Sequence, residues 1–196
     1  MRGNTDIYGM AAGTDPLHGT VEVVLEPWEY EWACHVGIRR YTANWGKKDA
    51  HYYRKERMED DRTAQQVACV AELAVAKHTN RFWSGTVWAA GEHKNNTWRP
   101  DVGRNIEVRH IRKPTSQAAV RRKQLGQGLV LWVAYPVRPE CRSVHLLGWL
   151  PMDEAWDAGE PADYDPSGNT RVVPHTALRS PEPPRSVADT TNGGAA

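Results

Sequence analysis

The sequence predicts an α/β (α+β) fold in which helices come first and the strands of a mixed sheet follow. Two observations predict this class. Apolar residues recur at helical spacing after Thr63, and an unbroken apolar run covers residues 129–135. Helical spacing gives a helix one buried face, and an unbroken apolar run suits a strand buried on both faces. We therefore expect a central mixed β-sheet flanked by helices.

The length and composition predict one domain with loose ends. The chain has 196 residues, which fits a single domain. We expect a flexible leader over residues 1–18, the domain over residues 19–180 and a disordered tail over residues 181–196, because the two ends are polar and rich in Gly or Pro. A domain of this size buries about 70% of its unfolded surface and needs no covalent staple.

The composition argues against several classes of protein. The three cysteines are isolated and odd in number, which argues against a disulfide framework or a structural zinc site and fits a reducing cytoplasm. The eight histidines include no His-Glu-x-x-His arrangement. No apolar run approaches the roughly 20 residues of a membrane span, and the N-terminus lacks the apolar core of a signal peptide. We therefore expect no membrane partner.

The N-terminal part predicts a short strand followed by a helix. Residues 18–25 alternate between apolar and polar side chains, which is typical of a strand. Pro27 suits the first turn of a helix, and residues 28–45 carry apolar side chains in a helical rhythm. Trp28 and Trp32 belong to that rhythm, so we expect them to be mostly core residues.

A charged loop over residues 46–60 is expected to precede a second helix. Thr63 and Gln66 have the spacing of a capping box, which predicts the beginning of this helix. Glu72 lies at the flank of the apolar stripe, where its carboxylate is half drawn toward the interior. The alternative is an exposed charge paired with Lys77. The stripe consists of Val67, Val70, Ala71, Ala74 and Val75.

The rest of the chain is predicted to be rich in strands. Residues 112–127 are basic and contain proline and glycine, which favours a mobile loop that can include a short helix. Residues 152–156 are expected to form a helical turn. The predicted strands cover residues 82–89, 105–111, 129–135 and 143–150, with one further extended contact at Val172 and Val173.

Residues 98–110 bring two carboxylates and a cation together. Glu107 and Arg109 are two residues apart on a predicted strand, so they project to the same face. The turn before that strand can bring Asp101 beside them. Two carboxylates that share a site repel each other unless a cation neutralises them, so the pattern favours a hard divalent metal, Mg²⁺ (or Mn²⁺). The alternative is a solvated strand with a surface ion pair.

A local basic run suggests a nucleic-acid partner, although the net charge of the chain is only +1. Clustered cations can meet a phosphate backbone, and the alternative is a solvated face. Tryptophans fill cores and also stack on bases, and both roles stay open for Trp83, Trp88 and Trp98 near the acidic stretch. The cations of this run are Arg104, Arg112, Lys113, Arg121, Arg122 and Lys123.

Five short pieces occur in a characteristic order between residues 26 and 180. They are residues 71–77, 100–103, 107–109, 148–149 and 173–178. This ordered set resembles the PD-(D/E)XK nuclease superfamily, in particular small phage and prophage proteins of that fold. The resemblance implies a restriction-endonuclease-like core and metal-dependent hydrolysis of phosphodiester bonds in nucleic acid, with DNA as the expected substrate. It also implies a phage-type protein in the cytoplasm of a bacterial host cell, and it leaves a homodimer open.

The catalytic parts of the superfamily carry over residue by residue. Glu72 matches the helix carboxylate that supports the metal shell, Asp101 matches the Asp of Pro-Asp, and Glu107 matches the acidic residue of the (D/E)XK half. The resemblance implies that Asp101, Glu107 and the Val108 carbonyl hold Mg²⁺. Arg109 stands where the lysine usually stands, and the gap between the two strand-region acids is short for the superfamily.

The departures from the superfamily pattern keep other functions open. Arginine stays charged and is a poor proton acceptor, so it removes a group whose pKa could be tuned. One alternative is a catalytically inactive nuclease-fold module that binds nucleic acid or a host protein. Another is a structural phage protein whose carboxylates merely pair with Arg104 and Arg109.

Overall fold

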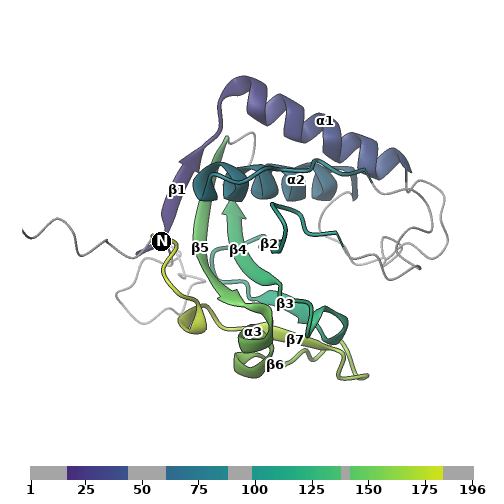
Figure 1. The fold of residues 1–196 in the computed structure, drawn as a ribbon, viewed down its shortest axis with the longest axis vertical. Coiled ribbons are helices and arrows are strands. Elements are labelled where there is room, and N and C mark those ends of the chain that lie inside the picture. Colours follow the sequence, from purple (N-terminus) through teal and green to yellow (C-terminus); the bar gives the residue numbers. More distant parts are fainter. Residues whose placement is uncertain (1–16, 44–60, 88–98, 138–141, 183–196) are drawn as a thin grey trace, which may run out of the picture.

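The computed structural model describes residues 17–43, 61–87, 99–137 and 142–182. Over these residues the protein has a mixed α+β fold, with two long helices on one face of a four-stranded sheet and a smaller sheet at its other side (Figure 1). The predicted leader, tail and charged loop lie almost wholly outside the described residues. Within the described residues, no helix has the length and apolar character needed to cross a membrane.

The helices and strands follow the predicted order, with additions in the second half of the chain. They are β1 (Val21–Val24), α1 (Pro27–Ala43), α2 (Asp61–Thr79), β2 (Ile106–His110), β3 (Ala118–Arg121), η3 (Arg122–Gln124), β4 (Val130–Pro136), β5 (Ser143–Pro151), α3 (Met152–Ala158), β6 (Glu160–Pro161), β7 (Thr170–Val173) and η4 (His175–Ala177).

The main sheet is mixed, as predicted, with strand order β1-β5-β4-β2. Strand β2 pairs parallel with β4, whereas β5 pairs antiparallel with both β4 and β1. Strand β4 is central, and four consecutive residues, 131–134, are buried. The prediction that this apolar run is a strand buried on both faces is therefore confirmed. Strand β2 lies at the edge of the sheet, which leaves its outer side open to the segment that precedes it.

Two apolar cores form on the two faces of the main sheet. Because side chains alternate along a strand, Trp132 and Ala134 enter the core shared with α1 and α2, whereas Leu131 and Val133 enter the core shared with α3 and the small sheet. The same alternation places Ile106 and Val108 of β2 in the helix-side core. Their neighbours on β2 consequently face the opposite way.

The small sheet corrects the prediction of a loop over residues 112–127. Residues 118–121 form β3, which pairs with β7, and β7 pairs with β6. Ala118 and Val120 are buried in the second core, so this short strand depends on apolar contacts that lie far away in the sequence. The extended contact predicted at Val172 and Val173 is confirmed, because both residues belong to β7.

Two further predictions are wrong in the described residues. Within residues 82–87 only Trp83 takes part in β-pairing, as an isolated bridge to Val102 rather than a strand. Trp28 and Trp32 are 61% and 50% exposed, so they are not core residues. They stack on one another on the surface of α1, and Trp32 also contacts the buried ring of Trp83 edge to face.

The close crossing of α1 and α2 depends on Gly37. A Cβ atom at this position would lie 2.5 Å from the Cα atom of Gln66, which is far inside van der Waals contact. Although alanine favours a helix more than glycine does, we expect Gly37→Ala to destabilise the protein by about 1–3 kcal/mol, because backbone must move to admit the methyl group. Urea unfolding followed by circular dichroism measures this. Gly37→Val should cost more, and an alanine variant as stable as wild type would contradict the close crossing.

Candidate acidic site

A tight hairpin holds Asp101 against the outer side of β2. Val102 and Ile106 exchange two backbone hydrogen bonds of 3.1 Å, and Gly103 takes a positive φ of 58° in the turn between them. The Oδ2 atom of Asp101 accepts a hydrogen bond of 2.8 Å from the N–H of Val108. The prediction that the turn brings Asp101 beside the strand is therefore confirmed.

Glu107 and Arg109 project from β2 to one face, as their spacing predicts. Nη1 of Arg109 donates to Oε1 of Glu107 in an ion pair, and Glu107 is buried. Nε of Arg109 donates to the carbonyl of Ala119 on β3 at 3.1 Å, so the small sheet holds the guanidinium in place. Burial acts to lower the pKa of Arg109, but Glu107 and Asp101 outweigh it and raise the pKa.

Glu72 on α2 is buried and bound on both oxygens by Arg40 of α1. Nη1 of Arg40 donates to Oε1 at 2.6 Å and Nη2 donates to Oε2 at 2.9 Å. Nε1 of Trp83 also donates to Oε2, at 2.9 Å. Of the two predictions for Glu72, the inward orientation is correct, whereas Lys77 pairs with Glu29 on α1. Arg40 balances the charge of this carboxylate in the interior.

Arg40 was not among the predicted site residues. It is only 3% exposed, and its Nε donates to the carbonyl of Thr86 at 2.7 Å. The available signal was its spacing, because Val36 lies one turn earlier on the same buried face of α1. A basic residue on an apolar face needs a buried acidic partner, which here is Glu72. Burial acts to lower the pKa of Arg40, but Glu72 outweighs it and raises the pKa.

The surroundings of Asp101 disfavour the charged form of its carboxyl group. Burial raises its pKa well above the usual range, and the negative charges of Glu72 and Glu107 raise it further, against the opposing effects of the Val108 N–H and Arg109. The three carboxylates therefore interact electrostatically, and in the described residues the guanidinium groups of Arg40 and Arg109 pair with Glu72 and Glu107. The charged form of Asp101 is unfavourable in these surroundings, and a proton or a cation would relieve it.

The three acids do not meet at one point. Among the described residues, no group of three or more His, Cys, Asp or Glu side chains has the geometry to hold a metal ion. Strand alternation explains this, because Val108 faces α2 and the Glu72 side, whereas Glu107 faces the small sheet. Asp101 lies at the edge of β2, within electrostatic range of both glutamates.

The donor atoms fit a hard divalent cation at two of the three carboxylates. Asp101 and Glu107 supply carboxylate oxygens on the same strand edge, and the crowding of negative charge on Asp101 would be relieved by such a cation. The Val108 carbonyl also lies here, although Nη1 of Arg109 donates to it at 3.2 Å. Glu72 does not fit as a direct ligand, because Arg40 binds both of its oxygens.

All six cations predicted to contact nucleic acid are exposed. Arg121 and Lys123 both interact electrostatically with Glu107. Desolvation and the positive charge of Arg109 lower the pKa of Arg121. Partial burial, Arg121 and Arg109 likewise lower the pKa of Lys123. Cations that repel one another in this way favour an anion between them. Arg122 instead lies over the ring of Trp156, at 5.6 Å from its centroid.

The fold and the site together define a mixed α+β protein with a carboxylate–guanidinium cluster at the edge of its main sheet. None of the family models, curated proteins or solved structures compared with the chain matches it. The assignment to the PD-(D/E)XK superfamily therefore stays a prediction, and so do the roles of the site residues.

Proposed function

We propose that the protein is a metal-dependent nuclease with a restriction-endonuclease-like core, which hydrolyses phosphodiester bonds in nucleic acid, DNA being the expected substrate. The observation that carries this proposal is the state of Asp101. A hairpin holds it on the Val108 N–H, and burial together with the charges of Glu72 and Glu107 raises its pKa, so a divalent cation bound there would stabilise its charged form.

The surroundings of the acids support the proposal in two ways. A helix carboxylate, an aspartate in a hairpin and a Glu-x-Arg strand lie around one sheet edge, in the order that the PD-(D/E)XK pattern requires. Arg121 and Lys123 lie within electrostatic range of Glu107, so a phosphate bound by these cations would be held near the acids. A phage-type nuclease of a bacterial cytoplasm remains the biological setting that we propose.

In this mechanism Asp101 and Glu107, with the Val108 carbonyl, would hold Mg²⁺ (or Mn²⁺). When bound, such an ion polarises the phosphate and lowers the pKa of a water molecule. Arg109 stays protonated, so it stabilises negative charge on the phosphate and orients Glu107, and does not accept a proton. Glu72 acts through its partner: it fixes Arg40 between the two helices and adds negative charge near Asp101.

A second candidate function is a nuclease-fold module that binds nucleic acid or a host protein without cutting. The ion pair between Arg109 and Glu107 favours it, because an arginine in this position already neutralises one of the carboxylates that a metal would need. Calorimetry with Mn²⁺ separates the two functions. Binding that is lost in Glu107→Gln supports the nuclease, whereas no binding to the wild-type protein, or binding that Glu107→Gln leaves unchanged, supports the module.

The nuclease is tested by nicking of supercoiled plasmid DNA, and of a structured RNA, in Mg²⁺ or Mn²⁺. We expect cleavage by the wild-type protein and a loss of roughly 100-fold or more in Glu107→Gln, since one of the proposed ligands of the metal is removed. Glu31→Gln, an exposed change on α1, is the matched control and should cut normally. Cleavage that persists in Glu107→Gln would show that the chemistry lies elsewhere.

A further inference from the structure

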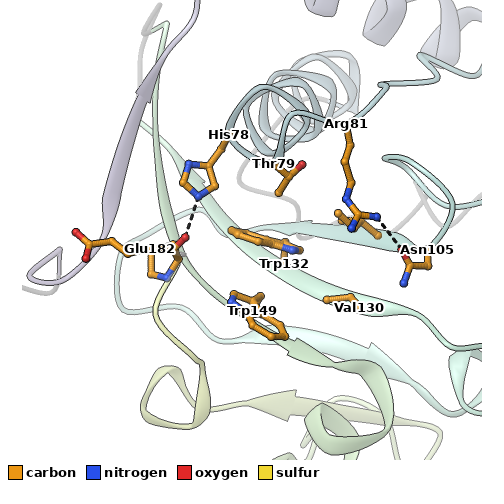
Figure 2. Close-up of a pocket in the computed structure, with 10 residues that line it drawn as sticks. His78, Thr79, Arg81, Asn105, Val130, Trp132, Trp149 and Glu182 are labelled. Carbon is orange, nitrogen blue, oxygen red and sulfur yellow. Dashed lines mark hydrogen bonds between the residues drawn. The ribbon is translucent and has the colours of Figure 1, made fainter. Parts of the chain in front are cut away.

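A pocket of about 390 Å³ lies between the main sheet and the end of α2, next to the acidic hairpin (Figure 2). Its floor is formed by Trp132 on β4 and Trp149 on β5, which are directly opposite each other in the strand register. His78 and Thr79, in the last turn of α2, lie across from this floor. The arrangement makes a slot with aromatic rings along one side.

The two indole rings are held in place by the protein itself. His78 contacts the Trp132 ring edge to face, with centroids 5.6 Å apart. Nε1 of Trp149 donates to the carbonyl of Ser180 at 3.1 Å, and the guanidinium of Arg179 lies 5.0 Å from the centroid of the Trp149 ring. A flat ligand would therefore meet an aromatic surface that is already ordered, which reduces the entropy lost on binding.

The end of the pocket nearest the hairpin is positively charged. Arg81 lies there, and its Nη1 donates to Oδ1 of Asn105 at 3.3 Å. Asn105 in turn donates from Nδ2 to the carbonyl of Gly128 at 3.3 Å, which fixes the amide. The side chain of Arg81 packs against Gly103 of the hairpin turn, since a Cβ there would lie 3.3 Å from its Cδ. Glu182 lies at the opposite end (Figure 2).

We propose that this pocket binds one unpaired nucleobase, stacked on the half-buried indole ring of Trp149 beside the buried Trp132, with its phosphate at Arg81. A nucleobase is flat and aromatic, so it stacks on an indole ring. The phosphate is an anion and needs a cation such as Arg81. The volume is within the range of small-molecule sites, about 300–1,000 Å³.

The inference rests on the proposed function and makes it more specific. Asn105 lines the pocket and belongs to the same hairpin as Asp101, so a strand whose base fills the pocket would carry its neighbouring phosphate toward Asp101 at the edge of β2. The proposed substrate would then contain unpaired bases, as in single-stranded or frayed nucleic acid. A free nucleotide has the same base and phosphate, and the experiment separates these two sources.

The test is fluorescence anisotropy with a labelled short single-stranded oligonucleotide of mixed sequence, in EDTA so that no cleavage occurs. We expect saturable binding, weakened about tenfold or more by Trp149→Leu, because base stacking on one aromatic side chain contributes that much. Arg81→Ala should weaken binding and reduce its dependence on salt, since one phosphate contact is lost. Trp28→Leu and Arg39→Ala, both exposed on α1, are the controls for loss of a tryptophan and a cation.

Further measurements show whether the pocket takes its base from a nucleic-acid strand or from a free nucleotide. Competition by AMP would support a site for free nucleotides, and binding of the oligonucleotide without such competition would support a site for a strand. A blunt duplex of the same sequence should bind more weakly than the single strand. Because binding is measured in EDTA, where no metal-dependent cleavage occurs, the pocket can be correct even if the nuclease proposal fails.

The inference is overturned if the wild-type protein shows no saturable binding of the oligonucleotide or of AMP. It is also overturned if Trp149→Leu and Arg81→Ala, each shown to be folded by its thermal unfolding curve, bind as tightly as wild type. Binding of a purely apolar dye at the pocket without competition by either nucleic-acid probe would likewise assign the site to another class of ligand.

Discussion

Replacing Glu72 with alanine is expected to destabilise the protein by about 3–5 kcal/mol, because it leaves a buried charge without its partner. The guanidinium of Arg40 is only 4% exposed at the side-chain level and makes two hydrogen bonds to this carboxylate. Trp83 would lose its acceptor at the same time, and an unsatisfied buried donor adds about 1–3 kcal/mol in other proteins. Arg40→Ala should be damaging for the same reason, since it leaves the glutamate uncompensated.

The double variant Arg40→Leu/Glu72→Leu gives the decisive comparison. Removing both charges removes the desolvation penalty as well, so we expect the double variant to be more stable than either single alanine variant. Urea unfolding followed by circular dichroism measures all of them. Glu154→Ala is the control, because Glu154 and its partner Arg179 are both about half exposed, and such a pair contributes about 0.2–1 kcal/mol. A Glu72→Ala variant no less stable than Glu154→Ala would contradict the buried pair.

This pair also shows which parts of the site the sequence could predict. Local periodicity offered the inward orientation of Glu72 as one of two predictions, since Ala71 and Leu73 flank it on a stretch of α2 that proves to be buried, but it did not decide between them. Its partner did not follow, because Arg40 is 32 residues away and only the crossing of the two helices brings them together. The same holds for the Trp83 N–H, whose position depends on a single bridge to Val102.

The same difference between local and long-range information separates the helices and strands that were predicted correctly from the one that was missed. Strands β2 and β4 and helix α2 were predicted close to their observed bounds, because each carries its own apolar pattern. The strand β3 was missed because it has only four residues, lies among basic side chains and is stabilised by pairing with β7 about fifty residues later. The alternation that placed Glu107 beside Arg109 also places Glu107 on the face away from Glu72, and that consequence separates the three acids.

Replacing Asp101 with asparagine is expected to remove divalent-cation binding and, at the same time, to make the metal-free protein more stable at neutral pH. Burial, Glu72 and Glu107 all raise the pKa of Asp101, so its negative charge is unfavourable in the folded state. Asparagine has no charge, and its side-chain oxygen can still accept the hydrogen bond from the Val108 N–H.

The pH dependence follows from the direction of this shift. An aspartate in the unfolded chain has a pKa of about 3.9, and in the folded protein the pKa of Asp101 is higher. Between these two values the folded state holds more protons than the unfolded state, so the stability that the bound proton contributes is complete below the unfolded pKa and is lost as the pH rises through the folded pKa. The advantage of Asp101→Asn over wild type should therefore grow from acidic to neutral pH.

Thermal unfolding in EDTA and in Mn²⁺, over that pH range, measures both effects. Mn²⁺ should stabilise wild type increasingly as the pH rises, because the proton on Asp101 must leave before the cation binds. Asp101→Asn should lose about 100-fold or more in Mn²⁺ affinity, since even indirect contacts to a metal can contribute that much. Asp163→Asn, an exposed change, is the control and should alter neither property.

The two effects together separate a functional carboxylate from a structural one. A carboxylate that only caps the Val108 N–H should stabilise the fold, so a variant that is less stable in EDTA and still binds Mn²⁺ would reduce Asp101 to that role. Asp101→Asn could instead be more stable without metal and unable to bind it. That result would show that the Asp101 charge is unfavourable for folding and is needed for binding the cation. Such an exchange of stability for binding is characteristic of functional sites, because selection on activity retains groups that packing alone would remove.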